Sequence, residues 1–206
     1  MDPTMNVPDV RHRARAEAIN RRPVVAVVGS GTRADPGTGE VGALIATLGC
    51  HLLSGAGGGV MEAVSRAFFE SPGRKGLVIG VVPGEVEPFP GVEEAEHPQS
   101  HYQPKNGYPN KWVEVALYTH LPDSGPKGTL PTSRNHIVVL SADAIVGLPG
   151  GEGTQSEMWL ATHYGVPIIA YGDHSQLPPG VRLAQTIDDV CRFLAESCLA
   201  PSRRTA

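Results

Sequence analysis

The sequence lacks any long hydrophobic run. No stretch approaches the roughly 18 consecutive apolar residues that a transmembrane helix needs, and the first residues have no apolar segment of the secretory-signal type. Aromatic residues are also scarce, at 5% of the chain, although 40% of the residues are hydrophobic. These features predict a folded protein with neither a membrane span nor a secretory signal.

Groups suited to metal or cofactor chemistry are few. Cys50, Cys191 and Cys198 are odd in number and lack a CxxC spacing, so we interpret them as thiols of the reducing cytoplasm. His97 and His101 are four residues apart, but the proline-rich surroundings favour a solvated loop over a metal site. The four lysines lie in polar turns or at loop margins, which disfavours a pyridoxal phosphate Schiff base. We predict no metal and no cofactor.

The net charge is small, at −4. Proteins that bind nucleic acid polymers or anionic membranes through their overall charge carry a basic excess, which this sequence does not have. Any affinity for phosphate must therefore be local. We expect a small phosphorylated ligand, with neither a nucleic acid polymer nor a membrane as partner.

Glycine (25 residues) and proline (19 residues) are plentiful, and short apolar segments alternate with segments of helical periodicity. Strands alternating with helices build right-handed crossover units and a parallel sheet covered on both faces. We predict an α/β fold: a single Rossmann-like, doubly wound, mainly parallel sheet. The predicted strands are 24–28, 50–53, 77–82, 112–119, 143–148 and 166–171, and the predicted helices are 40–48, 60–71, 133–142, 154–164 and 186–199.

The predicted Rossmann-like domain covers residues 23–199, because 206 residues suit one domain. Residues 1–22 are polar and rich in arginine, and we interpret them as a solvated arm in preference to a basic binding patch. The segment 84–131 begins with a stretch rich in proline and polar residues, which favours an insertion or lid. Residues 200–206 form a tail.

Glycine-rich turns follow three of the predicted strands, after Val28, Leu53 and Leu148. Carboxyl ends of parallel strands share one edge of a sheet, so these turns should converge there, where such folds bind ligands. None of them matches the dinucleotide fingerprint GxGxxG with its acidic partner, and no GxxxxGK[ST] occurs. Dinucleotide and P-loop chemistry are therefore disfavoured.

The third turn is the strongest candidate for a phosphate site. It contains Gly150, Gly151 and Gly153, whose missing side chains allow a ligand to approach the backbone closely. Thr154 follows as a predicted N-cap, and a helix N-terminus with unpaired N–H groups attracts anions. We therefore predict that these four residues bind phosphate.

The motif LPGGEGTQSE, with SRN before it and GAGGGVME earlier, resembles the LONELY GUY family, long labelled possible lysine decarboxylases. The likeness covers roughly residues 24–171, outside the insertion. It implies a phosphoribohydrolase that cleaves the N-glycosidic bond of nucleoside 5′-monophosphates and releases free base and ribose 5-phosphate. Residue by residue, it implies that Gly150, Gly151, Gly153 and Thr154 hold the phosphate and that Arg134 and Glu157 are catalytic. It also implies a homodimer. Further ligand contacts are expected from Gly29, Ser30, Gly57, Gly58, Met61 and Asn135.

Two departures keep a second function open. The catalytic arginine is followed by Asn135, where plant-type members have lysine, and the second turn reads GVME instead of GLMG. Both variants resemble a bacterial branch that includes molybdenum cofactor carrier proteins, which bind a phosphorylated pterin without hydrolysing it. The alternative function is therefore a non-catalytic carrier or sensor of a phosphorylated ligand.

The residue chemistry suits hydrolysis, with one structural alternative. A carboxylate at Glu157 can stabilise the cation that develops at the ribose and orient water, and the Arg134 guanidinium can anchor phosphate or hydroxyl groups. The residues TQSE, however, also spell a capping box, in which Glu157 would only bond the N-cap N–H of its helix. Both interpretations of Glu157 are compatible with the sequence.

Overall fold

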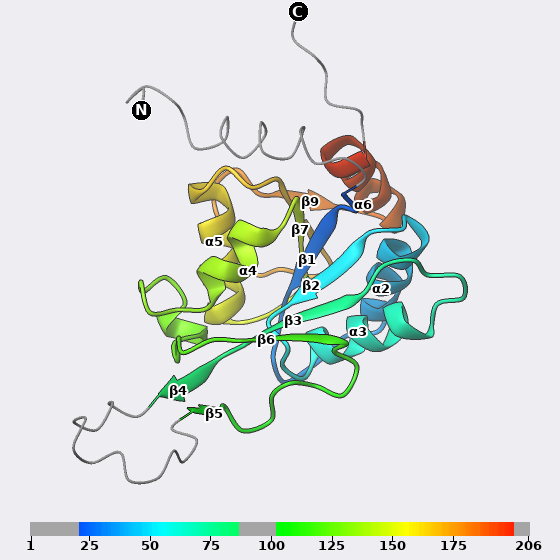
Figure 1. Cartoon of the computed structure of the whole chain (residues 1–206). Coiled ribbons are helices and arrows are strands. Elements are labelled where there is room, and N and C mark those ends of the chain that lie inside the picture. Colours follow the sequence, from blue (N-terminus) through cyan, green and yellow to red (C-terminus); the bar gives the residue numbers. More distant parts are fainter. Residues whose placement is uncertain (1–20, 87–101, 200–206) are drawn as a thin grey trace, which may run out of the picture.

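The computed structural model describes residues 21–86 and 102–199. Seven parallel strands form one sheet in the order β6-β3-β2-β1-β7-β8-β9 (Figure 1). From β1 the chain builds outward first on one side and then on the other, which is the doubly wound pattern. The strands are β1 Val24–Val28, β2 His51–Ser54, β3 Val78–Val82, β6 Val115–Tyr118, β7 Ala144–Gly147, β8 Ile168–Tyr171 and β9 Arg182–Ala184.

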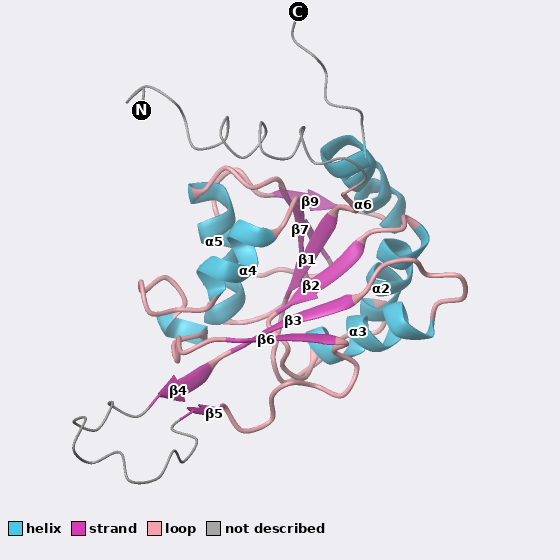
Figure 2. Ribbon diagram, viewed as in Figure 1, coloured by secondary structure: helices cyan, strands magenta, loops and turns pink. Residues whose placement is uncertain are grey.

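Helices cover both faces of this sheet (Figure 2). One face carries α2 (Thr38–Thr47), α3 (Val60–Glu70) and α6 (Ile187–Leu194), and the other carries α4 (Asn135–Ser141) and α5 (Glu152–His163). A π-helical turn, η3 (Ala195–Leu199), continues α6, and a short 3₁₀ turn, η2 (Gly125–Lys127), packs against α5. The predicted Rossmann-like α/β fold is confirmed.

The two faces follow from the alternation along the buried strands. In β1, Val25 and Val27 pack into the core beneath α2, α3 and α6, while Ala26 and Val28 pack into the core beneath α4 and α5. Successive side chains of a strand point to opposite faces, and a strand buried on both faces reads as a continuous apolar run. The apolar run VVAVV therefore marks a central strand, as the sheet order shows.

Most predicted elements are confirmed, and the differences lie at element ends and at the sheet edges. β1 has the predicted bounds, and α6 begins with the predicted capping box between Thr186 and Asp189. The predicted strand 112–119 is shorter, as β6. The strand β9 was missed, because two of its three residues are exposed and it lacks an apolar run.

The segment 84–131 contains two features that its composition does not reveal. β4 (Gly84–Val86) and β5 (Tyr102–Pro104) pair as an antiparallel hairpin, which projects beyond the main sheet (Figure 1). β6, in the same segment, pairs in parallel with β3. Part of this segment is therefore an edge of the main sheet.

The chain entering β1 is held by one ion pair and by hydrogen bonds. Arg21 donates to both carboxylate oxygens of Asp143, each at 2.6 Å, and the Val24 N–H donates to the same carboxylate at 2.8 Å. Arg22 bonds the carbonyl of Gly49 at the end of α2. These two arginines, which fall in the predicted arm 1–22, thus contact the folded domain. Residues 1–20 and the tail 200–206 lie outside the described residues.

Candidate functional site

Three glycine-rich turns meet at one edge of the sheet. They follow β1, β2 and β7, which are neighbours in the sheet order and run parallel. Backbone hydrogen bonds connect the turns: the Ser30 N–H donates to the Pro149 carbonyl at 3.0 Å, and the Val60 N–H donates to the Ser30 carbonyl at 2.9 Å. The predicted convergence of the three turns is confirmed.

The meeting point coincides with the topological switch of the sheet. After β1, the strands β2, β3 and β6 lie on one side, and β7, β8 and β9 lie on the other. Connections therefore leave the carboxyl ends of β1 and β7 in opposite directions and open a crevice between them. Ser30 and Pro149 stand at this crevice.

Close packing between the turns explains why two of their residues, Gly150 and Gly59, are glycines. A Cβ on Gly150 would lie 2.0 Å from Thr154 Oγ1 and 2.8 Å from the Ser30 nitrogen. Gly59 has a φ of +59°, and a Cβ there would lie 2.4 Å from the Ser30 carbonyl oxygen. Side chains at either position would separate the turns, so these two glycines hold the site together.

The helix after the third turn begins earlier than predicted. α5 starts at Glu152, with Gly151 as its N-cap and no side-chain capping bond. The prediction of Thr154 as N-cap is therefore wrong, because the flexible glycines already turn the chain into helix before it. Without that cap, Glu157 has no capping box to complete, and the interpretation of Glu157 as a capping residue is wrong as well. The first turn of α5 has no capping side chain, so its N–H groups suit an anion.

Arg134 and Glu157 form an ion pair beneath the turns. Arg134 Nη1 lies 3.7 Å from Glu157 Oε1, and their side chains are 4% and 10% exposed. Arg134 is the N-cap of α4, and Glu157 lies on the buried face of α5. The guanidinium lies against Gly55, where a Cβ would come within 2.0 Å of Arg134 Nη1. The structure therefore brings the two predicted catalytic residues together at the end of β2.

The electrostatics of this pair are unusual. Burial raises the pKa of Glu157 from 4.5 to about 7, and the neighbouring Arg134 opposes that rise. Among the residues that the structure describes, Arg134 Nε and Nη1 have no hydrogen-bond partner although both atoms are buried. Buried donors without partners are costly, so these two nitrogens are suited to acceptors on a ligand.

The other predicted ligand contacts lie in tight packing between the turns. Gly29 packs against Val60, Gly58 packs against the carbonyl of Gly31, and Gly57 packs against Met61. Asn135 is 1% exposed, and its amide donates to Ser156 Oγ at 3.3 Å. Asn135 therefore connects the start of α4 to α5.

A segment after the hairpin supports the second turn. Asn110 donates through its backbone N–H to the Ala56 carbonyl at 2.8 Å and through its amide to the Gly57 carbonyl at 2.9 Å. Ala56 has a φ of +62°, a strained conformation for a residue with a side chain. Tyr108 lies beside Gly57. Sequence reasoning missed these contacts, because the segment was interpreted as an insertion.

A cleft of 460 Å³ opens beside the first and third turns. Three predicted residues line it: Ser30, Gly150 and Gly151. Arg134 and Glu157 are not among its lining residues. Sequence reasoning missed the other polar residues of the cleft, although those after β8 could have been found from the same rule about carboxyl ends. The missed residues are Thr32, Arg33, Gln155, Asp173, His174 and Ser175.

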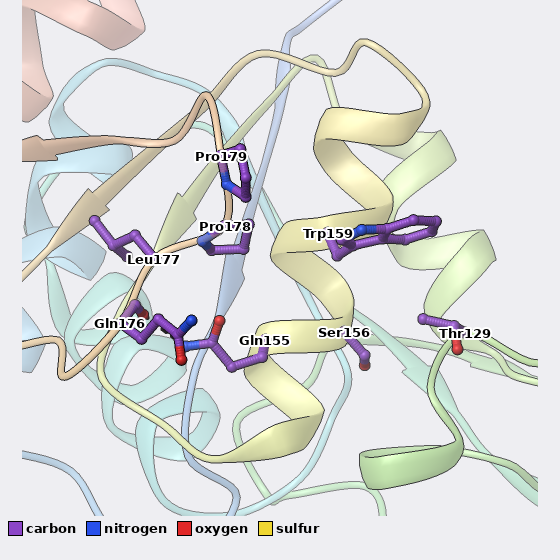
Figure 3. A pocket seen from close by; sticks show the side chains of 8 residues that line it. All are labelled: Thr129, Gln155, Ser156, Trp159, Gln176, Leu177, Pro178 and Pro179. Atoms are coloured by element: carbon purple, nitrogen blue, oxygen red, sulfur yellow. Dashed lines mark hydrogen bonds between the residues drawn. The ribbon is translucent and has the colours of Figure 1, made fainter.

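A second hollow, of 720 Å³, lies along the outer side of α5 (Figure 3). Its walls include Trp159 on the helix and the loop segment Gln176, Leu177 and Pro178. Gln155 lines both hollows and donates to the Gln176 carbonyl at 2.8 Å. This bond holds the loop against α5 between the two hollows.

Two further points concern metals and membranes. Within residues 21–86 and 102–199, no group of three or more metal-ligating side chains is found, and no helix is long and apolar enough to cross a membrane. The pair His97 and His101 lies outside the described residues.

Comparison with known proteins identifies the family of the chain. A model of the SLOG cluster4 family matches residues 22–189. The chain belongs to this family. A solved molybdenum cofactor binding protein of Rippkaea orientalis is 27% identical, with a TM-score of 0.61 over 88% of this chain and 100% of its own.

Two further relatives of this SLOG cluster4 protein are similar over most of their lengths. The solved Moco carrier protein of Chlamydomonas reinhardtii is 25% identical, with a TM-score of 0.59 over 85% of this chain and 99% of its own. An uncharacterised protein of Archaeoglobus fulgidus is 26% identical over 77% of this chain and 83% of its own.

Proposed function

We propose that this SLOG cluster4 protein is a phosphoribohydrolase of the LONELY GUY type, which cleaves nucleoside 5′-monophosphates into free base and ribose 5-phosphate. The buried ion pair of Arg134 and Glu157 at the switch edge carries this proposal. A pair that only stabilised the fold would be better replaced by apolar residues, since desolvating two charges offsets much of their attraction. A carboxyl pKa near 7 beside guanidinium nitrogens that lack a hydrogen-bond partner is typical of a reaction site.

The third turn is proposed to hold the 5′-phosphate. Gly150 and Gly151 expose backbone to the cleft, and the first turn of α5 offers N–H groups without a side-chain cap. Phosphate at this position receives hydrogen bonds from the backbone and the favourable end of the helix dipole. Thr154, buried against Gly150, completes the cradle.

Glu157 and Arg134 are proposed to act on the ribose. The C1′–N bond breaks with its electron pair leaving on the base, and positive charge develops at C1′ and the ring oxygen. An ionised Glu157 stabilises this charge and accepts a proton from the water that bonds to C1′, while the base takes up a proton from solvent. Arg134 Nε and Nη1 donate to ribose oxygens and hold the sugar in place.

A product assay tests the proposal. The purified protein is incubated with a panel of purine and pyrimidine 5′-monophosphates, and free base is measured by chromatography. Release is expected from at least one of them, and Glu157→Gln should reduce it at least 100-fold, within the range attributed to positioned acid–base groups. Glu70→Gln, an exposed carboxylate at the end of α3 outside the proposed site, is the matched control and should retain activity. An active Glu157→Gln would contradict the assigned role.

A second candidate function is a carrier of a phosphorylated ligand such as molybdenum cofactor. The 27% identity to a molybdenum cofactor binding protein over 88% of the chain favours it. A carrier needs the phosphate cradle without hydrolysis. Tight binding of a phosphorylated pterin, together with no base released from any 5′-monophosphate, would establish the carrier and exclude the hydrolase.

We further propose a homodimer that works in the cytoplasm. Trp159 on α5 and Leu130 are 48% and 44% exposed, which leaves apolar surface for a second copy of the chain. Cys50, Cys191 and Cys198 are odd in number and lack a CxxC spacing, as suits a reducing compartment. Light scattering after size exclusion should give twice the 21.7 kDa of the chain, and Trp159→Glu should give the monomer.

A further inference from the structure

The 460 Å³ cleft beside the third turn needs a positive charge that the proposed catalytic pair does not supply. A phosphate monoester carries about 1.5 to 2 negative charges near neutral pH, whereas a helix N-terminus offers only about half a positive charge. Arg134 is buried against Gly55 beside Glu157 and does not line the cleft. Phosphate at Gly150 and Gly151 therefore requires another cation.

Arg33 lines this cleft from the turn after β1. Its side chain is 78% exposed, and its Nε lies 3.5 Å from Asp35 Oδ1. An exposed pair of this kind contributes little to stability and can exchange partners readily. A guanidinium there offers further N–H groups in a planar fork, the geometry that matches phosphate.

The backbone of Arg33 is fixed even though its side chain is exposed. The Arg33 N–H donates to Ser30 Oγ at 3.2 Å, and a Cβ on Gly59 would lie only 2.7 Å from the Arg33 nitrogen. The second turn therefore packs directly against the first turn at Arg33. Ser30 in turn donates to Pro149, which precedes Gly150. Arg33 is thus tied through two contacts to the phosphate cradle.

Asp173 lines the same cleft from the loop after β8. A carboxylate there repels an anion, so it opposes the attraction of Arg33. A cleft with a cation and a carboxylate suits a ligand that carries both an anion and hydrogen-bond donors, such as the phosphate and hydroxyl groups of a sugar phosphate.

We propose that Arg33 is the phosphate-neutralising residue of the site and that Asp173 accepts hydrogen bonds from hydroxyl groups of the same sugar phosphate. The inference rests on the proposed phosphate cradle, but it does not depend on hydrolysis. It assigns phosphate recognition to the turn after β1, while Arg134 keeps its place beside Glu157.

Calorimetric titration with ribose 5-phosphate and with inorganic phosphate tests the role of Arg33. Arg33→Gln should weaken the binding of both probes about tenfold, and Arg33→Lys should give an intermediate loss. Arg66→Gln is the matched control, since Arg66 does not line the cleft, is 62% exposed and pairs with Glu70 on α3. Thermal unfolding of each variant should match the wild type, because the Arg33 side chain is exposed.

Asp173→Asn tests the role of Asp173 independently. Removing a repulsive charge should tighten the binding of inorganic phosphate two- to threefold, while ribose 5-phosphate gains less or loses affinity. Unchanged binding in Arg33→Gln, or equal weakening in Arg66→Gln, overturns the inference but leaves the phosphate cradle intact. A wild-type protein that binds neither probe overturns the cradle and Arg33 together.

Discussion

Arg134 Nη1 lies 3.7 Å from Glu157 Oε1, and both residues are almost completely buried. The distance is too long for a hydrogen bond, so the arginine attracts the carboxylate without satisfying it. Burial therefore dominates, and the pKa of Glu157 rises to about 7. At neutral pH the carboxyl group is poised between its two protonation states, where a general base is most effective.

The rate of hydrolysis should rise with pH through the pKa of Glu157. The reactive form is the carboxylate, so kcat/KM is expected to be half-maximal near pH 7 and to level off about one pH unit higher. Because Arg134 lowers this pKa, Arg134→Gln should move the rise to higher pH as well as reduce the plateau. Initial rates between pH 5 and 9 measure both effects. A profile that is flat across pH 7 would exclude Glu157 as the ionising group.

The same pKa makes stability depend on pH. The folded pKa of about 7 exceeds the ordinary 4.5, so the folded state holds its proton more tightly than the unfolded state. The contribution of Glu157 is therefore most favourable below pH 4.5 and is lost as pH rises through 7. When the pH is raised from 5 to 8, the free energy of unfolding of Glu157→Gln should increase by about 2 kcal/mol relative to that of the wild type. Urea unfolding of both proteins at the two pH values measures this change.

Gly150 and Gly151 should respond differently to alanine. A Cβ on Gly150 would lie 2.0 Å from Thr154 Oγ1, whereas a Cβ on Gly151 would meet nothing within 4 Å. Gly150→Ala should therefore destabilise the fold by about 1–3 kcal/mol and abolish phosphate binding. Gly151→Ala is the control with the same chemical change, and it should lower stability by less, through only the preference for glycine over alanine at an N-cap. Thermal unfolding and titration with ribose 5-phosphate compare the two, and equal effects would contradict the packing described.

Arg21→Ala should destabilise the folded domain. The guanidinium donates to both oxygens of Asp143, whose side chain is only 9% exposed. Since Arg21 itself is 38% exposed, solvent screening limits the loss to about 1 kcal/mol. Arg192→Ala removes an ion pair with Asp189 whose side chains are 70% and 33% exposed, and it should change stability by less. Urea unfolding of the two variants tests the comparison, and an effect no larger than that of Arg192→Ala would contradict it.

Much of the fold could be predicted because burial on both faces leaves a direct sequence signal. VVAVV predicts β1 residue for residue, and the three glycine-rich turns could be placed at one edge because parallel strands share it. β9 could not be found, since an edge strand of three residues, two of them exposed, carries no apolar run. The contacts of Arg21 depend on Asp143, which is distant in sequence.

The candidate site could be predicted only in part. The resemblance to the family motif predicted Arg134 and Glu157 as site residues, and the two form an ion pair in the structure. The capping interpretation of Thr154 failed because glycines before it already start the helix at Glu152. Arg33 and Asp173 line the cleft from loops with no motif of their own. The rule about carboxyl ends of strands locates these loops, but only the three-dimensional structure shows which of their side chains line the cleft.

The most direct test compares a nucleoside 5′-monophosphate with the same nucleoside lacking phosphate. Both are incubated with the wild-type protein at pH 8, where Glu157 is ionised, and the free base released is measured over time. We expect base from the monophosphate and at least 100-fold less from the nucleoside, because the proposed cradle at Gly150 would anchor the phosphate. No base from any monophosphate, or equal release from the two compounds, would contradict the account.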